Sequence, residues 1–405
     1  MKSYKLYIGG NIYGAGNIGD DAVLEGIISI LNQLNYDFSY TIGTYYGYKL
    51  DLSCPNIKYI DCYNDLTVTK AIKESDFVIC GGGTLIGDEL GLAFPLEFTA
   101  TLIARAKLFD KKVFIFAIGA NELKTKLGRR IVKNIFGLAN VITLRDKESA
   151  DVCKSIIKKK DIIPTADPSF ILTPLETRRT KEIRKNFSSG NKFFGVNVVN
   201  EVWSSKKKYK KVIAEVCDYL NKKYDLIPVF FCNEVREGEF FDYEANKEAI
   251  SYLSCKSEII ERIYYSPREM IDIISNFNFI IGMRMHTLIF AALTKTPFIS
   301  ISRIDKVDNF MKQFGLLSSY SVSKPNKNKL INDIEKIIEN KSYYENAIEE
   351  RLPVLKKAAL KNKLIFDKTM NGKSSFLPRF NFMSLKYTGI TSLTKNIVKR
   401  ILIGK

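Results

Sequence analysis

The chain of 405 residues is long enough for two or three domains, and its 46% hydrophobic and 26% charged residues exclude collagen-like, low-complexity and wholly disordered proteins. The formal net charge of +18 is uneven, because residues 1–175 carry +2, residues 176–370 carry +9 and residues 371–405 carry +7. This asymmetry favours an anionic ligand such as a phosphate on the second part and an uncharged ligand on the first, although a lysine-rich solvated surface explains it equally well.

Short apolar stretches alternate with amphipathic helical ones from the first residues, which is typical of parallel α/β folds. The polar, basic stretch 176–191 then interrupts the pattern, so we expect a first Rossmann-like domain over 1–175 and a passage to a second domain. Within the first domain the pattern predicts strands at 5–8, 38–42, 57–60, 77–80, 113–118 and 141–144, and helices at 20–34, 91–109, 125–138 and 147–158.

The alternation restarts at Phe193 and predicts a second Rossmann-like domain over 176–340. Ser266, Pro267 and Glu269 carry the helix-start signals of an N-cap, a first-turn proline and a capping box. We therefore predict an α/β fold of two doubly wound domains that face each other across a cleft, with ligands at the carboxyl ends of the strands. The expected strands are 193–199, 226–231, 259–264, 277–281 and 297–301, and the expected helices are 207–222, 237–253 and 287–293.

The end of the chain differs from both domains. Residues 327–363 have a helical pattern, and we expect a helical brace over 341–370. In the tail 371–405, aromatic residues interleave with lysine and arginine, and 390–403 fits a basic amphipathic helix. Such a segment suits the surface of an anionic membrane, and the alternative is a tail that is loose or docked on the body of the protein.

Cysteine usage and hydropathy indicate a cytoplasmic protein. The seven cysteines are scattered and include no Cys-x-x-Cys pair, which fits reduced thiols. No apolar run approaches the roughly 20 residues of a membrane span, and the N-terminal residues have no signal-peptide core. The single histidine, His286, lies far from any cysteine in the sequence, so we expect no bound metal. Any membrane contact would be peripheral, through the tail on the inner face of the membrane.

A glycine-rich turn follows the first strand. Gly14, Gly16 and Gly19 match the G-x-G-x-x-G spacing of dinucleotide-binding turns. Asp20 and Asp21 follow at once, and their charges would repel a pyrophosphate at the helix start, which argues against a nicotinamide cofactor. Two interpretations remain: the carboxylates cap the helix, or Asn17, Asp20 and Asp21 accept hydrogen bonds from sugar hydroxyls. The latter would make these three residues part of an acceptor site.

Two other strand ends carry candidate ligands. The strand 77–80 runs into Gly81, Gly82, Gly83 and Thr84, a turn that brings bare backbone close to a ligand or is simply tight. It lacks the lysine of a P-loop, so nucleotide hydrolysis is not indicated. Arg145 ends the strand 141–144 at the same edge, where it can bind an anion or form an ion pair with Asp146 or Glu148.

The stretch 279–287 combines a strand, a glycine turn and a helix start. Its backbone N–H groups and helix dipole favour an anion, which Arg284 can bind in bidentate fashion. His286 can supply or remove a proton near neutral pH. A lone histidine is more often a structural residue, but its position at a strand end raises the weight of the catalytic interpretation.

Four stretches of the chain resemble the polysaccharide pyruvyl transferase family, and they follow one another along the sequence in the same order as in that family. Shorter stretches at 167–170 and 304–307 support the resemblance, whereas Arg303 stands where an aromatic residue is expected in this family. The resemblance implies a two-domain fold of the GT-B type and an enzyme that uses phosphoenolpyruvate to place a pyruvate ketal across two hydroxyls of a glycan sugar, with release of phosphate. The four stretches are Gly16-Asn17-Ile18-Gly19-Asp20-Asp21-Ala22, Gly81-Gly82-Gly83, Leu144-Arg145-Asp146-Lys147-Glu148-Ser149 and 282–292, which begins Gly282-Met283-Arg284-Met285-His286-Thr287.

The resemblance also implies a division of roles. His286 and Arg284 are the expected catalytic residues, with phosphoenolpyruvate as co-substrate and no further cofactor. The acceptor is a glycan, which a lipid would carry if the tail binds a membrane. The expected donor-binding residues are Arg145, Lys306, Gly282 and Thr287, and the expected acceptor-binding residues are Asn17, Asp20, Asp21, Gly82, Gly83 and Thr84.

Two other functions fit parts of the sequence. A glycosyltransferase of the same two-domain shape would take a sugar nucleotide in the basic second domain, beside Arg284. A nucleic-acid-binding protein would explain the pI of about 9.3 and the basic aromatic tail. The chain contains no recognised nucleic-acid-binding module, and its positive groups are spread over more than 200 residues, so nucleic acid is not an expected partner.

Overall fold

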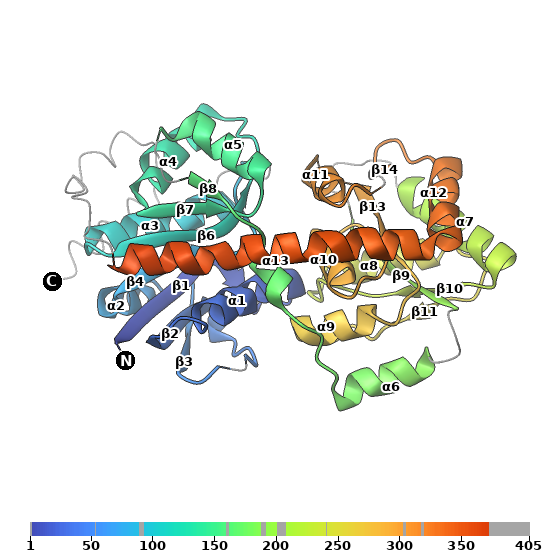
Figure 1. Ribbon diagram of the computed structural model, residues 1–405, viewed down its shortest axis with the longest axis horizontal. Coiled ribbons are helices and arrows are strands. Elements are labelled where there is room, and N and C mark those ends of the chain that lie inside the picture. Colours follow the sequence, from blue (N-terminus) through green and yellow to red (C-terminus); the bar gives the residue numbers. More distant parts are fainter. Residues whose placement is uncertain are drawn as a thin grey trace. The chain divides into compact units, whose positions relative to one another are not determined.

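The computed structural model describes residues 2–52, 54–88, 93–158, 162–187, 192–200, 208–239, 241–302, 305–316 and 320–371 (Figure 1). These residues form two compact units. The first unit comprises residues up to 15, residues 23–171 and residues from 356 onward, and the second comprises residues 16–22 and 172–355. The chain therefore passes between the units at four places.

A parallel sheet of eight strands forms the centre of the first unit. Its order is β3-β2-β1-β4-β6-β7-β8, with β5 paired to β6, so the direction of winding reverses between β1 and β4. In a doubly wound sheet, ligands bind at the carboxyl ends of the two strands that flank this reversal. The strands are β1 (Ser3–Tyr13), β2 (Asp37–Thr44), β3 (Ile57–Asp61), β4 (Phe77–Gly81), β5 (Thr84–Ile86), β6 (Lys112–Ala120), β7 (Val141–Leu144) and β8 (Ile162–Pro164).

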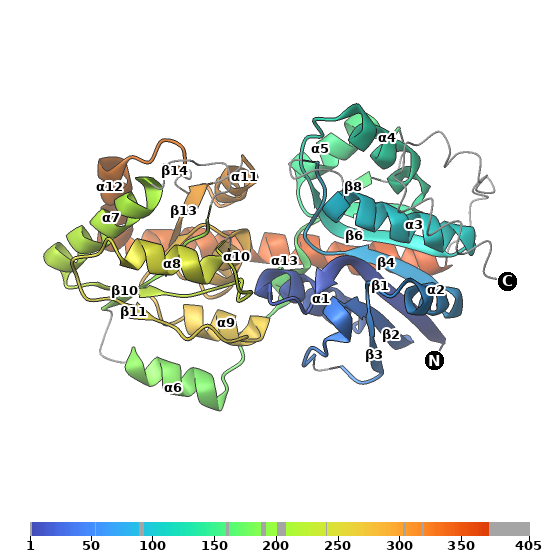
Figure 2. The same ribbon diagram turned by 180° about the vertical axis from the view of Figure 1, so that it is seen from behind.

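Helices cover both faces of this sheet (Figures 1 and 2). On one face, Phe366 in the C-terminal part of α13 packs its ring within 5.3–6.3 Å of the rings of Phe38, Phe77 and Phe114. The helices of this unit are α1 (Ile18–Leu31), α2 (Asp65–Glu74), α3 (Phe98–Leu108), α4 (Lys126–Asn134), α5 (Lys147–Ile156) and the end of α13 (Lys341–Asn371), with short turns η1 (Tyr45–Gly47), η2 (Ala93–Glu97), η3 (Phe136–Leu138) and η4 (Pro168–Ile171).

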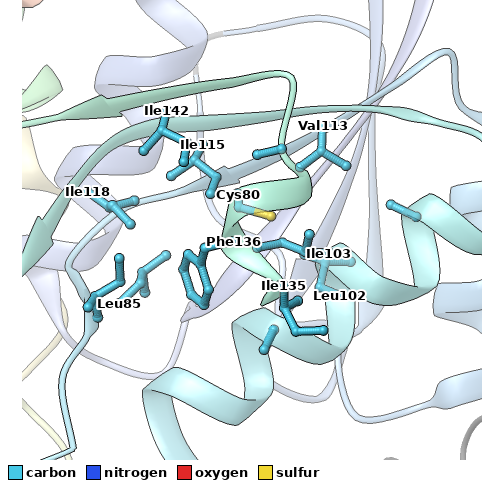
Figure 3. Packing of buried hydrophobic residues seen from close by; sticks show 14 of the residues in the cluster. Cys80, Leu85, Leu102, Ile103, Val113, Ile115, Ile118, Ile135, Phe136 and Ile142 are labelled. Atoms are coloured by element: carbon cyan, nitrogen blue, oxygen red, sulfur yellow. The ribbon is translucent and has the colours of Figure 1, made fainter. Parts of the chain in front are cut away.

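The opposite face of the sheet packs against α3 and α4 in a continuous apolar core (Figure 3). Ile103, Ile115 and Phe136 have no exposed surface there. Cys80 lies in the same core, and burial raises the pKa of its thiol above the ordinary range. The buried runs of β4 and β6 explain why both strands are apolar at nearly every position, since a parallel sheet covered on both faces has no solvent side.

A parallel sheet of six strands forms the second unit. Its order, β11-β10-β9-β12-β13-β14, reverses between β9 and β12. The strands are β9 (Phe193–Asn197), β10 (Ile227–Phe230), β11 (Glu258–Ile259), β12 (Ile280–Gly282), β13 (Phe298–Ser302) and β14 (Tyr320–Ser321). The helices are α6 (Arg178–Asn186), α7 (Lys208–Tyr224), α8 (Asp242–Ile250), α9 (Pro267–Ile274), α10 (Met285–Leu293), α11 (Asp305–Gln313), α12 (Lys327–Glu339) and the first part of α13.

The predicted fold class is confirmed, since both units are α/β with parallel, doubly wound sheets. The capping box of Ser266 and Glu269, with Pro267 at the helix start, is also confirmed in α9. Six elements, α2, α6, α11, β5, β8 and β14, were not predicted, and the expected strand 259–264 is reduced to β11. Strands of two or three residues carry too little alternation to be recognised.

The boundary between the units differs from the predicted one. The second unit begins at Leu172, because Leu175 donates its backbone N–H to the carbonyl of Arg268 and Arg268 donates back to Thr173. The stretch 176–191, expected to be a passage, contains α6, which packs on α9. The brace expected over 341–370 is the helix α13, whose residues divide between the units at 355. Tail residues 372–405 lie outside the described residues.

The contact between α6 and α9 predicts an acid-sensitive step in unfolding. Burial alone would raise the pKa of Glu269, but hydrogen bonds from Arg179, the Ser266 backbone and Thr177 lower it from 4.5 to about 2. The folded pKa lies below the unfolded one, so this carboxylate stabilises the fold above about pH 4.5, and that contribution is lost as the pH falls toward 2. We expect Glu269→Gln to lower the melting temperature at pH 7 and to change it little near pH 2. Glu182→Gln, an exposed control on α6, should have no such effect, and an equal loss at both pH values would contradict the assignment.

Candidate functional site

The turn after β12 delivers two candidate side chains of the second unit. Gly282 ends β12 at the reversal of the sheet, and a Cβ atom there would lie 2.8 Å from Cδ2 of Leu288, so glycine lets this leucine pack against the turn into α10. Arg284 is the extended residue before α10, and His286 lies in its first turn. The side chains of both residues are partly exposed. The predicted strand, glycine turn and helix start are thus present.

The imidazole of His286 lies directly against the start of α1. A Cβ atom built on Gly19 would lie 2.4 Å from Nδ1 and 2.6 Å from Cγ of His286, so only glycine allows this approach. The segment is fixed by backbone hydrogen bonds, from Ile18 to the carbonyl of Asn233 and from Val235 to the carbonyl of Gly16, each 2.9 Å long. Residues 16–22 therefore belong to the second unit.

The sequence analysis placed Asn17, Asp20 and Asp21 in the first domain, whereas residues 16–22 belong to the second unit. Their role as acceptor ligands stays a prediction. Asn17 caps α1, because its Oδ1 accepts from the backbone N–H groups of Gly19 and Asp20. Asp21 is buried and accepts from the Tyr264 hydroxyl at 2.9 Å. Of these three residues, Asn17 and Asp20 are partly exposed, whereas Asp21 is buried.

Arg284 is held by carboxylates of its own unit. Its Nε lies 2.7 Å from Oδ1 of Asp242, and its Nη2 lies 2.6 Å from the same atom and 3.9 Å from Glu234. Burial by itself lowers the pKa of the guanidinium, but the charges of Asp242 and Glu234 outweigh burial and raise it. Arg284 therefore stays charged, and its contacts within the described residues use only one edge of the guanidinium.

Asp242, which the sequence analysis did not identify, organises this side of the site. It is fully buried at the start of α8, and its Oδ2 accepts from Asn197 Nδ2 and from the backbone N–H groups of Asn233 and Glu234 at 2.9–3.1 Å. A single aspartate in a helix start carries no sequence signal. The hydrogen bonds of Asp242 show that residues at or after the ends of β9, β10 and β12 meet at this carboxylate.

Thr287 and Lys306 were both predicted to bind the donor. The hydroxyl of Thr287 is buried, donates to Asn197 Oδ1 at 3.1 Å and accepts from Asn233. Its side chain therefore supports the ends of β9 and β10 instead of facing a ligand. Lys306 lies in α11, and its side chain is outside the described part of the structure, as is Arg303.

Charge around the turn is balanced instead of strongly positive. Arg236 forms hydrogen bonds to Glu234 that raise its pKa, and the charge of Asp20 acts on both Arg236 and Arg284. Three carboxylates thus face two guanidinium groups among the described residues here. The turn presents Arg284 in a fixed orientation, and a doubly anionic ligand would need further cations.

In the first unit, the glycine turn after β4 lies at the reversal of that sheet. Gly82 and Gly83 have φ values of +90° and +60°, which explains the glycines. A Cβ on Gly82 would lie 3.3 Å from Nδ2 of Asn11, a buried amide nitrogen without a hydrogen-bond partner. Asn11 was not predicted, and its position in β1 next to Gly82 makes it an additional candidate for the acceptor side.

Arg145 joins this turn to the end of β7. Its Nη2 donates to the Thr84 hydroxyl at 2.9 Å. Its Nε lies 3.6 Å from a carboxylate oxygen of Asp146, and its Nη1 lies 3.6 Å from one of Asp167. The side chain is only 5% exposed and packs on Gly119. The ion pair with Asp146, one of the two interpretations of this residue, is thus formed, and Arg145 holds Thr84 in place within the first unit.

Comparison with known families gives the decisive finding. The sequence model of the family described as polysaccharide pyruvyl transferase matches residues 17–305, well over half of the chain. The chain belongs to the polysaccharide pyruvyl transferase family. The matched range includes Gly19, Arg145, Arg284 and His286, so the predicted resemblance is confirmed. A comparison with curated proteins gave no significant match.

Solved structures show that this pyruvyl transferase family member has a GT-B fold. S. aureus MnaA with UDP is 13% identical, with a TM-score of 0.63 over 94% of this chain and 100% of that one. UDP-GlcNAc 2-epimerase from Methanocaldococcus jannaschii is 14% identical, with a TM-score of 0.62 over 91% and 99%. The Neisseria meningitidis enzyme bound to UDP-GlcNAc is also 14% identical, with a TM-score of 0.56 over 91% and 99%. At such identities the likeness concerns the fold alone.

Two further observations concern metals and membranes. In the part of this transferase that the structure describes, no group of three or more His, Cys, Asp or Glu residues could hold a metal ion. No helix in the same part is long and apolar enough to cross a membrane.

The contact between Gly19 and His286 yields a sharp prediction. In Gly19→Ala the new methyl group would overlap the imidazole, so we expect transferase activity to fall about 10- to 100-fold through misplacement of the ring. Because the chain has one histidine, its imidazole proton signals in NMR should shift in this variant. Gly137→Ala, where the nearest atom lies at 3.7 Å, is the control. Unchanged imidazole signals in Gly19→Ala would contradict the described contact.

Proposed function

We propose that this protein transfers the pyruvate group of phosphoenolpyruvate onto two hydroxyls of a glycan sugar, forming a pyruvate ketal and releasing phosphate. The match to the polysaccharide pyruvyl transferase family carries the proposal. The turn after β12 supports it, because Arg284 stands at the N-cap of α10 and His286 stands in its first turn, and an anion is stabilised at a helix start.

The proposed reaction needs a proton at one carbon and two successive attacks at another. His286 would deliver a proton to the methylene of phosphoenolpyruvate, which makes the neighbouring carbon electrophilic, and a sugar hydroxyl would attack that carbon. The C–O bond to phosphate then breaks, and the second hydroxyl closes the ketal. The two hydroxyl protons are accounted for by the new methyl group and the released hydrogen phosphate.

In this proposal Arg284 binds the carboxylate or phosphate through the edge of its guanidinium that faces away from Asp242. The balanced charge around the turn means that Arg284 alone would not neutralise the donor. Lys306, and Arg145 through the motif it shares with the family, are the proposed additional groups. Asp20 and the backbone at Gly82 and Gly83 remain proposed contacts of the acceptor.

A ligand-binding experiment separates this proposal from a nucleotide-sugar enzyme. Two of the solved neighbours are bound to UDP or UDP-GlcNAc, so UDP-GlcNAc is the appropriate competitor. A ligand that binds only the folded state raises the melting temperature. We expect phosphoenolpyruvate to raise it and UDP-GlcNAc to leave it unchanged, with a smaller response to phosphoenolpyruvate in Arg284→Met. Stabilisation by UDP-GlcNAc but not by phosphoenolpyruvate would reject the proposed donor.

We also propose that the acceptor is lipid-linked and that the tail 371–405 contacts an anionic membrane. The tail has a net charge of +7 and interleaved aromatic residues. The second half of α13, which precedes the tail, has a solvent-exposed stripe that combines apolar and basic side chains, at Val354, Lys357, Lys361, Leu364 and Lys368.

Vesicle binding tests this membrane contact. We expect the full chain to co-sediment with phosphatidylserine-containing vesicles at low salt, and a chain that ends at Asn371 to bind much less. Vesicles of phosphatidylcholine alone are the control, because an electrostatic contact requires anionic lipid. Equal binding of both chains would show that the tail is not the contact.

A further inference from the structure

A group of exposed tyrosines at one edge of the first unit is not used by the proposed chemistry. Tyr45, Tyr46, Tyr48 and Tyr63, here called the tyrosine platform, are 40%, 70%, 49% and 45% exposed. The first three follow β2 and the fourth follows β3. The last residues of these strands, Thr44 and Asp61, are paired in register, so the platform stands at the carboxyl edge of the parallel sheet. In doubly wound sheets this is the edge where ligands bind.

Three of the four platform rings, those of Tyr45, Tyr46 and Tyr63, contact one another while remaining open to solvent. The ring centroids of Tyr45 and Tyr46 lie 4.6 Å apart, and Tyr63 lies 6.1 Å from the first and 5.5 Å from the second. Tyr63 also packs on Phe98 at the start of α3, at 6.3 Å. Ordered aromatic rings thus form one surface instead of scattered side chains.

The backbone that carries the platform is strained. Tyr46 has φ 46° and ψ 31°, in the left-handed region that bulky residues avoid, and Gly47 follows with φ +75°. Burial does not compensate this strain, because Tyr46 is the most exposed ring of the four. Residues with a strained backbone are concentrated at binding sites. The conformation is therefore better explained by what the ring contacts outside the chain.

The chemistry of the platform fits an uncharged sugar ring. Aromatic faces pack on the C–H face of a pyranose, while tyrosine hydroxyls can exchange hydrogen bonds with its hydroxyl groups. The platform consists of tyrosines, without aliphatic or basic side chains among its members, which suits a polar, neutral partner better than a lipid or a phosphate. The near-neutral charge of residues 1–175 agrees with such a partner.

The platform is also linked to the proposed catalytic turn by a short stretch of chain. Tyr48 packs on Gly14, where a Cβ would lie 3.0 Å from its Cδ1 atom. Gly19, which contacts His286, follows five residues later. The segment between them is the glycine-rich turn that passes from the first unit to the second.

We infer that the tyrosine platform binds neutral sugar rings of the acceptor glycan. This inference rests on the proposed function for the identity of the glycan as acceptor, but sugar binding itself does not depend on turnover. It can therefore be tested without phosphoenolpyruvate.

The first experiment measures sugar binding by saturation-transfer NMR on the full chain. The probes are neutral hexasaccharides of glucose, galactose, mannose and N-acetylglucosamine. We expect at least one to bind, and Tyr46→Ala with Tyr63→Ala to weaken that binding 10-fold or more. Tyr252→Ala, an exposed tyrosine of the second unit, should change nothing. Absence of binding by all four probes, or equal binding by the double variant, would overturn the inference.

A second variant separates binding from folding. Tyr46→Gly places glycine at the strained position, so we expect an unchanged or higher melting temperature together with weaker sugar binding. Tyr46→Phe keeps the ring and should retain most binding. A lower melting temperature and unchanged sugar binding in Tyr46→Gly would show that the ring serves the fold and would overturn the inference.

Kinetics connect the platform to the proposed function. In the double variant we expect the KM for the glycan to rise 10-fold or more and the KM for phosphoenolpyruvate to stay the same. If the double variant kept both its turnover and its KM for the glycan, the inference about the tyrosine platform would be wrong, but the proposed function would stand. Platform-dependent sugar binding in a protein that never consumes phosphoenolpyruvate would reject the proposed function and leave the platform as a glycan site.

Discussion

Replacing His286 by alanine is expected to slow ketal formation by about 100-fold or more, because a positioned general acid or base contributes roughly that much to a proton transfer. Stabilisation by phosphoenolpyruvate should persist, since Arg284 and its carboxylate partners are untouched. The measurement is the initial rate of phosphate release with saturating donor and glycan.

Two controls define this result. Met285→Leu changes the neighbouring residue of α10 without altering charge and should keep the rate. His286→Gln keeps a polar side chain against Gly19 but cannot transfer a proton at neutral pH, so it should be as slow as alanine. Undiminished ketal formation in both histidine variants would remove the imidazole from the mechanism.

Replacing Asp242 by alanine is expected to have the largest effect on stability. It would leave two backbone N–H groups without their acceptor and the Arg284 guanidinium with only the more distant Glu234, and breaking a largely buried ion pair costs about 3–5 kcal/mol. The melting temperature of the second unit should fall, and the donor should bind more weakly because Arg284 loses its orientation. Thermal unfolding followed by calorimetry measures the first effect.

A double variant shows whether the lost ion pair is the cause. Adding Arg284→Met to Asp242→Ala removes the unpaired charge and should restore part of the melting temperature, although donor binding stays weak. Exposed ion pairs give the matched control, so Lys70→Ala, whose partner Glu74 is 57% exposed, should change stability little. If the second substitution lowered stability further, Asp242 would act through its backbone contacts and not through Arg284.

Local patterns carried most of the fold prediction. Buried parallel strands such as β4 and β6 are continuous apolar runs, and Ser266 with Pro267 and Glu269 marks a helix start within four residues. Boundaries were predicted less well, because the contact of Arg268 with residues 173–175 involves residues about 95 positions apart.

The site residues that could be predicted are those that follow the end of a strand closely in the sequence. His286 and Arg284 belong to this class, since both follow β12 within four residues. Their surroundings could not be predicted, because Asp242 and Glu234 reach Arg284 from other elements 42 and 50 positions away. For the same reason the charge of the second half, although strongly positive as a sum, did not predict the balanced charge around the turn.

Residues near the start of the chain show a second limit. The spacing of Gly14, Gly16 and Gly19 identified a turn, but an apolar pattern cannot show which unit a turn joins. Backbone hydrogen bonds with residues 233–235 assign 16–22 to the second unit and explain Gly19 by its contact with His286. The exposed tyrosines after β2 and β3 have no recognisable spacing in the sequence. Only the structure shows that they lie at one edge of the sheet.

Product analysis tests the central claim most directly. The protein would be incubated with phosphoenolpyruvate and the neutral oligosaccharides used for binding, and the mixture followed by proton and phosphorus NMR. We predict a new methyl singlet of a pyruvate ketal on the glycan that grows in equal amount with inorganic phosphate. Consumption of UDP-GlcNAc with transfer of its sugar, and no ketal methyl signal from phosphoenolpyruvate, would contradict the claim.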